Sequence, residues 1–249
     1  IPLQWIKSAD WRKAERAFFI INQSAVSIDP TELKILNART EPNAIASRAI
    51  VRNATGHKYW EDFSKPSQVE IEALAQNIYS ALYNPPLDPP IRTVELPIAW
   101  HGYGSQTLPL IFDFLNVANN IPVKDPSKEP KKLQIDERQK ADEQQVLKVL
   151  RNSKKLAQRF TGTDESSLGL LPAIYFYSSN GRHQPTAVLA MGLLIMDLEK
   201  KDKLLKFTSV RAKFEDFLIG HKYYVNQLTV KNGSMAKGFR PLKDLYEFI

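Results

Sequence analysis

Residues 18–37, FFIINQSAVSIDPTELKILN, decide how the first part of this chain folds. One apolar run ends in the polar triplet Asn22-Gln23-Ser24, and a second apolar run begins after Asp29. Asp29 suits the N-cap of a helix, and Pro30 suits the first helical position, where the N–H that proline lacks would have no partner. The stretch therefore predicts a helix, a polar turn and a second helix, but by itself it names no reaction.

The whole chain predicts a mainly α-helical bundle with a small β contribution near its N-terminus. Residues 1–6, IPLQWI, are typical of a short buried strand, whereas apolar residues elsewhere recur at helical spacing. Besides the helix that Asp29 begins, we expect helices over about 9–21, 42–55, 67–82, 108–117 and 136–160. Two further helices lie on either side of a break at 178–185, and the last one covers 241–249. Another helix has an apolar face formed by Phe207, Val210, Phe214, Phe217 and Leu218. Ser67 and Glu70 form a capping-box pair. Residues 231–238, KNGSMAKG, predict a flexible basic loop.

The clearest candidate for a domain boundary is the proline-rich run NPPLDPP, residues 84–90. Closely spaced prolines favour a stiff, extended connection over a helix or a strand. The run divides the chain into residues 1–84, which include the predicted strand, and residues 91–249, which predict a helical domain.

The composition excludes several classes of protein and site. The longest apolar run, residues 187–196, contains Gly192 and is shorter than the roughly 18 residues of a membrane span, so it predicts a buried helix. The absence of cysteine excludes disulfides and thiol nucleophiles, and it fits a reducing compartment such as the cytoplasm. No HExxH, GxSxG, histidine cluster or recognisable carboxylate pair is present, so no metal site and no catalytic residue is predicted.

Positive charge is unevenly distributed along the chain. The formal net charge is +7, and Lys and Arg outnumber Asp and Glu by 9 to 5 in residues 1–60, 11 to 6 in 124–159 and 8 to 4 in 206–249. Clustered positive charge attracts phosphate backbones, because binding releases counterions. Nucleic acid is therefore the expected partner, and a solvated surface with surplus lysine is the alternative.

Four groups of residues are candidates for contacts to phosphate. The first group joins the polar turn with two arginines four residues apart on one predicted helix, and its members are Asn22, Gln23, Arg48 and Arg52. The second is a basic ridge on a long helix, formed by Lys148, Arg151 and Lys155, accompanied by Lys154 and Arg159. The third is the polar break between apolar segments, with Arg182 and His183, and the fourth is the basic loop, with Lys231 and Lys237.

The first three of these groups also have a purely structural interpretation. The arginines, with Arg39 nearby, have carboxylates such as Glu32 and Glu41 within the same sequence region, so ion pairs would occupy them. Most charges of the long helix would simply be solvated. The polar break at 178–185 is also typical of an ordinary turn between helices, which Pro185 and Thr186 would end.

Two stretches of the chain resemble a known family. IPLQWI and AERAFFIINQSAVSIDPTELKIL resemble the latter part of the ParB/sulfiredoxin-like domain, as found in the GmrSD-type restriction endonuclease N-terminal family and related DGQHR-motif proteins. The matching residues, which lie in the helix, in the turn with small polar residues and in the capped second helix, are Phe18, Asn22, Ser27, Asp29, Pro30 and Leu33. PAIYFYSSNGRHQPTAVLA, residues 172–190, is similar to helical C-terminal parts of such proteins.

The resemblance implies a prokaryotic DNA-directed defence or restriction-type protein. The acting motif of the family, Asp-Gly-Gln-Gln/His-Arg, is associated with nucleotide or phosphate chemistry, and it is missing from these 249 residues. We therefore expect this chain to be the later portion of a longer protein, or to act with a separate chain that supplies the first half. A nucleotide and Mg²⁺ would be cofactors of that complete protein. Whether the chain is part of an enzyme stays open. The alternatives are a non-catalytic helical module that binds a protein partner and a hydrolase that uses His101 or His183.

Overall fold

The described part of the chain is almost entirely helical. The computed structural model describes Ala17, Ile35, Ala38 and residues 40–85, 96–100, 107–125 and 141–249. These residues form nine helices, and the β structure among them is one isolated bridge between Tyr177 and His183. The mainly α-helical class is thus confirmed for the described residues. Apart from Ala17, the predicted strand over 1–6, the helix over 9–21 and the polar turn with Asn22 and Gln23 lie outside them.

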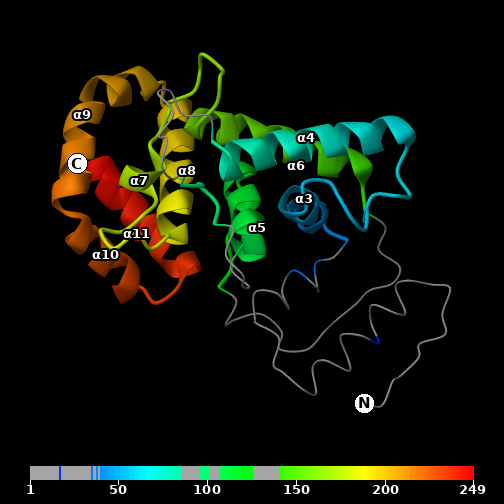
Figure 1. Cartoon of the computed structure of the whole chain (residues 1–249), viewed down its shortest axis with the longest axis horizontal. Helices are drawn as coiled ribbons and strands as arrows, with labels where there is room; N and C mark the ends of the chain where they lie inside the picture. The colour runs from blue at the N-terminus through cyan, green and yellow to red at the C-terminus, as the bar shows by residue number, and fades with distance from the viewer. Residues whose placement is uncertain are drawn as a thin grey trace.

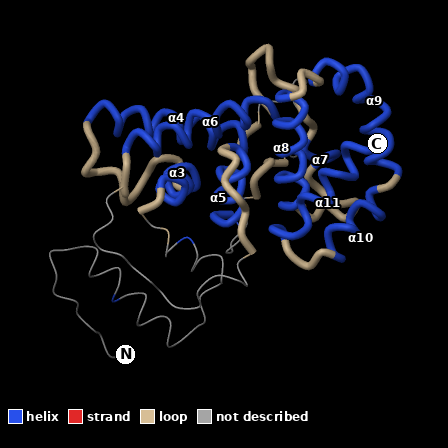
Figure 2. Tube along the Cα trace, turned by 180° about the vertical axis from the view of Figure 1, so that it is seen from behind, coloured by secondary structure: helices blue, strands red, loops and turns tan. Residues whose placement is uncertain are grey.

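The helices are arranged in two groups that meet in the middle of the molecule. Figure 1 shows α4 and α6 side by side on one half, α5 and α8 in the centre, and α9, α10 and α11 beyond α8. Figure 2, from behind, shows the same order. The elements are α3 (Pro42–Val51), α4 (Lys65–Tyr83), α5 (Thr107–Ala118), α6 (Glu143–Phe160), α7 (Pro172–Tyr175), α8 (Pro185–Lys200), α9 (Leu204–Gly220), α10 (Lys222–Lys231) and α11 (Met235–Phe248).

Local start signals explain where most of these helices begin. A proline occupies the first or second position of α3, α4, α7 and α8, where its fixed φ favours the helix. Asp142 caps α6, because its Oδ1 accepts hydrogen bonds from the backbone N–H groups of Gln144 (2.9 Å) and Gln145 (3.3 Å). These starts depend on neighbouring residues only, so they are readable in the sequence.

Three predicted boundaries are corrected by the structure. Helix α4 begins at Lys65, so the capping-box interpretation of Ser67 and Glu70 is wrong. Pro66 occupies the second position of the helix, and the carboxylate of Glu143 accepts a hydrogen bond from the N–H of the N-cap residue, Ser64, at 2.9 Å. Helix α6 begins at Glu143, because Asp142 is its cap. Helix α3 ends at Val51 rather than at residue 55, since residues 53 and 54 have φ values of 50° and 58°.

The C-terminal part also differs from the prediction. The apolar stretch before residue 178 contains only the single turn α7 in place of a buried helix. The predicted loop over 231–238 is reduced to a short turn with Gly233 at φ 74°, and α11 begins at Met235. Pro241 lies inside α11 although proline disfavours a helix interior. Burial of Phe239 and Leu242 explains why the helix forms around it.

One continuous core joins the described helices. Buried apolar residues from all nine belong to the same cluster, and α4 packs closely against α6, α5 against α8, and α8 against α11. The predicted stripes on α4 (Ile71, Leu74, Ile78, Leu82) and α6 (Val146, Val149, Leu150, Ala157, Phe160) are buried, as expected. The core therefore includes helices on both sides of the proline-rich run at 84–90.

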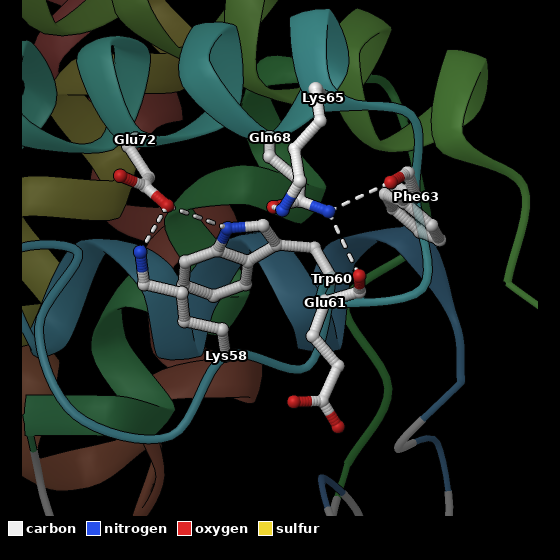
Figure 3. Close-up of polar contacts among 7 residues, drawn as sticks. All are labelled: Lys58, Trp60, Glu61, Phe63, Lys65, Gln68 and Glu72. Carbon is white, nitrogen blue, oxygen red and sulfur yellow. Dashed lines mark hydrogen bonds and ion pairs between the residues drawn. The ribbon is translucent and has the colours of Figure 1, made fainter.

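Hydrogen bonds and an ion pair hold the connection between α3 and α4, residues 52–64, against the side of α4. Figure 3 shows the side chains of Lys58 and Trp60 converging on one carboxylate oxygen of Glu72, at 2.6 and 3.3 Å. The amide of Gln68 donates to the carbonyl groups of Glu61 and Phe63 at 2.8 and 2.7 Å. Trp60 is almost completely buried, so Glu72 gives its indole N–H an acceptor that water cannot provide.

Candidate nucleic-acid interface

The structure places Arg48 and Arg52 over the same aromatic ring. The guanidinium carbon of Arg48 lies 4.5 Å from the ring centre of Tyr59, and that of Arg52 lies 5.7 Å from it. Arg48 is buried in α3 and also donates to the carbonyl of Ile35 at 3.3 Å. The four-residue spacing thus predicts correctly that the two arginines are neighbours. Arg39 and the polar turn of this predicted site lie outside the described residues.

The basic ridge on α6 is largely neutralised by other helices. Arg151 forms an ion pair with Glu70 on α4 at 2.7 Å, and Lys155 lies 3.4 Å from Glu199 on α8. Arg159 also binds Glu199 at 2.7 Å, and its hydrogen bond lowers the pKa of this carboxyl. Lys148 is exposed, and no described carboxylate lies within ion-pair distance of it. The ridge therefore presents less free positive charge than its sequence predicts.

Arg182 and His183 are adjacent in the chain but point to different surroundings. They belong to a tight turn in which Ser178 N–H donates to the Arg182 carbonyl at 2.9 Å. Arg182 is exposed, whereas His183 packs between Trp100 and Tyr177, with ring centres 6.4 and 5.3 Å away. Nε2 of His183 lies 2.7 Å from the carbonyl oxygen of Ile98, so it carries the proton and donates. Burial lowers the pKa of His183. His183 therefore has a structural role in this turn. His101, the other histidine considered for a hydrolase, lies outside the described residues.

The two lysines of the predicted basic loop also separate. Lys231 is exposed at the end of α10. Lys237 lies in α11, and its Nζ is 2.9 Å from a carboxylate oxygen of Asp125. The expectation of one flexible basic loop is therefore wrong, because the helix start at Met235 places Lys237 against the segment before residue 126.

Helix α9 presents basic residues that are not among the phosphate-binding candidates predicted from the sequence. Lys206, Val210, Lys213 and Phe217 follow one another at steps of four, three and four residues, so they lie on one side of the helix. Helical spacing predicts that Val210 faces the core, but its side chain is 45% exposed. The buried face is formed by Phe207, Phe214 and Leu218, which lie on a neighbouring stripe. The same apolar sequence fits both stripes, so only packing distinguishes them.

A row of aromatic rings continues this side of α9 into α10. The ring centres of Phe217 and His221 are 4.6 Å apart, those of His221 and Tyr224 6.2 Å, and those of Tyr224 and Tyr223 5.8 Å. Tyr223 and Tyr224 are 67% and 70% exposed. Figure 1 shows α9 and α10 at the edge of the molecule that is farthest from α4. We call this the α9–α10 surface, formed by Lys206, Lys213, Phe217, His221, Tyr223, Tyr224 and Lys231.

Other charged residues of the two helices are engaged in holding them in place. Arg211 donates to Glu215 at 2.6 Å and to the carbonyl of Gly169 at 3.0 Å, and the Tyr175 hydroxyl also donates to Glu215, at 2.7 Å. Burial and this contact with Glu215 raise the pKa of Tyr175. Lys222 donates to the carbonyl of Ala173, and burial lowers its pKa. In contrast, the three lysines of the α9–α10 surface have no carboxylate partner among the described residues.

The described residues offer no sign of a metal centre or a membrane segment. Within the ranges that the structure describes, no group of three or more His, Asp or Glu side chains could hold a metal ion. None of the described helices is both long and apolar enough to cross a membrane. The chain matches no protein-family model, and it has no significant similarity to a curated protein or to a solved structure.

Proposed function

We propose that this chain binds nucleic acid through the α9–α10 surface. The observation that carries the proposal is that Lys206, Lys213 and Lys231 are exposed without a carboxylate partner in the described part of the chain. In the other basic region, Arg151 and Lys155 already face carboxylates. Free lysines attract a phosphate backbone because their binding releases condensed counterions.

The resemblance to ParB-like, restriction-type proteins supports the same class of partner. Its second stretch, residues 172–190, forms α7, the turn that follows and the first part of α8. Helix α9 contacts this region through the hydrogen bond from Tyr175 to Glu215, and α10 contacts it through the hydrogen bond from Lys222 to the carbonyl of Ala173. In this proposal the helical part holds the nucleic acid of a DNA-directed defence protein, and any catalytic motif, with its nucleotide and Mg²⁺, lies outside this chain.

The first test compares two charge-reversed variants that change the net charge equally. One is Lys206→Glu with Lys213→Glu on α9, and the other is Lys148→Glu with Lys154→Glu on α6. Binding of fluorescently labelled DNA is measured by anisotropy at several salt concentrations. We expect the α9 variant to bind more weakly and to lower the salt slope by about one per lysine, because each phosphate contact adds about one released counterion.

The same experiment contains the outcomes that would contradict the proposal. Loss of binding in the α6 variant alone would place the site on the basic ridge around Lys148 and not on α9. Equal binding by both variants and the unchanged protein would exclude both surfaces. Circular dichroism spectra of the two variants serve as the folding control, since all four lysines lie outside the core.

A protein-interaction module is the second candidate function. Large apolar side chains stand exposed in the same region, among them Leu205, Ile219 and Val230. Exposed apolar residues that gather in one region often mark a protein interface. Salt distinguishes the two functions, because binding to nucleic acid weakens steeply as salt rises whereas binding through an apolar interface does not.

A further inference from the structure

The rings of the α9–α10 surface point to one kind of nucleic acid. We infer that this surface binds single-stranded nucleic acid, with bases stacked on Tyr223 and Tyr224. The inference rests on the proposed function and adds the strandedness of the ligand and the residues that recognise it.

The first argument is the exposure of the two tyrosines. At 67% and 70% exposure, most of each side chain is open to solvent. They are not isolated, because the row Phe217, His221, Tyr224 and Tyr223 is continuous through ring contacts of 4.6 to 6.2 Å. Such a row offers several neighbouring stacking positions, which one exposed ring would not.

The second argument is the accessibility of bases in the two forms of nucleic acid. In a duplex the faces of the bases are covered by their neighbours, so protruding tyrosines meet mainly the sugar–phosphate backbone. In a single strand each base has a free π face, and aromatic side chains bind it with little sequence preference. The exposed rings of this surface therefore suit a single strand better than a duplex.

The third argument is the charge that accompanies the rings. Residues 203–231 carry six basic and two acidic side chains, and one of the acidic ones, Glu215, is paired with Arg211. Lys213 lies one helical turn before Phe217, and Lys231 lies two turns after Tyr224 on the same side of α10. Positive charge thus flanks the aromatic row at both ends. A single strand whose bases stack on the row would place its phosphates near these lysines.

The experiment removes the rings and keeps all charges. The double variant Tyr223→Leu with Tyr224→Leu is titrated with labelled oligothymidine, with a single-stranded RNA of equal length and with a DNA duplex. The unchanged protein should bind the single strands more tightly than the duplex. The variant should lose roughly 5- to 150-fold in single-strand affinity for each stacked base. Its salt slope should stay the same, because no phosphate contact is removed. Phe248→Leu, an exposed ring outside the row, is the matched control and should change nothing.

Different failures point to different parts of the argument. If the tyrosine variant keeps its single-strand affinity while Lys206→Glu with Lys213→Glu loses binding, stacking is overturned and the proposed function stands. Preferential binding of the duplex by the unchanged protein also overturns the inference alone. If the unchanged protein binds none of the three nucleic acids, the proposed function and the inference fall together. The tyrosines are exposed, so equal melting temperatures of variant and unchanged protein confirm that the fold is intact.

Discussion

His183 illustrates how much the surroundings of a single residue decide. In the sequence it stands in a polar break and is a candidate for phosphate binding. In the structure its Nε2 donates to Ile98, 85 residues away in the chain, and its ring packs against Tyr177 and Trp100. Burial disfavours the charged imidazolium, which lowers the pKa of His183 below its ordinary value of 6.5.

This environment predicts a specific pH dependence of stability. Between the lowered pKa of the folded state and 6.5, the unfolded chain binds more protons at His183 than the folded chain does. The contribution of His183 to stability is therefore full above pH 6.5 and falls as the pH drops below that value. His183→Gln keeps a side-chain N–H donor and does not titrate. We expect the unchanged protein to lose more unfolding free energy than the variant between about pH 7.5 and about pH 5.5.

Urea unfolding at the two pH values measures this difference. Tyr177, the titratable ring against His183, stays neutral throughout because burial raises its pKa to about 12. All other titrating groups are common to both proteins, so comparison of the two pH slopes isolates His183. Identical slopes would show that the imidazole is not held in its neutral form.

At the scale of elements, two glycines show how helix propensity and packing compete. Gly192 lies in the middle of α8, and Gly238 lies in α11. A Cβ on Gly192 would lie 3.5 Å from both Leu156 and Phe160, which is an ordinary contact. A Cβ on Gly238 would lie 3.1 Å from the methyl group of Thr186 on α8, which is tighter than usual. The two positions thus share a helical backbone and differ in the space that the neighbouring helix leaves.

We expect Gly192→Ala to raise the free energy of unfolding by about 1 kcal/mol, the usual difference in helix propensity between glycine and alanine. Gly238→Ala should gain clearly less or lose stability, since α8 and α11 must move apart by a few tenths of an ångström. Urea unfolding of both variants under one condition provides the measurement. Equal gains would mean that α8 and α11 are packed less closely than the structure indicates.

At the scale of the whole molecule, the shared core implies cooperative unfolding. Ile78 on α4 and Phe239 on α11 are both fully buried and belong to the same cluster, although α4 and α11 are in opposite groups of helices. Contacts of α4 with α6, α6 with α8 and α8 with α11 connect them. A cavity at either end should therefore weaken the entire structure and not one half of it.

Ile78→Ala and Phe239→Ala test this coupling. Each should lower the free energy of unfolding by about 2–5 kcal/mol, the usual range for a large apolar residue that leaves a cavity in the core. Unfolding followed by circular dichroism should stay a single transition that both substitutions shift. Two separate transitions, with each substitution shifting only one of them, would instead support independent domains on the two sides of residues 84–90.

The sequence by itself determined most of the helices and the inward faces of α4 and α6. It also showed that Arg48 and Arg52 are neighbours. These features depend on residues three or four positions apart and on local signals such as Pro66 and Asp142, so they can be read without knowledge of the fold. For the same reason, residues 18–37 predict a helix–turn–helix locally, although they lie almost entirely outside the described residues.

Only the tertiary structure decided which charged residues remain free and which become structural. Arg151, Lys155 and Lys237 meet carboxylates on distant segments, whereas no carboxylate in the described part of the chain pairs with Lys206 or Lys213. Packing against α8 also keeps α11 helical on both sides of Pro241. The packing of the helices likewise leaves Val210 outside the core. Such partners lie tens of residues apart in the chain, so helical periodicity does not encode them. They depend on the three-dimensional packing of helices, and so does the position of the candidate interface.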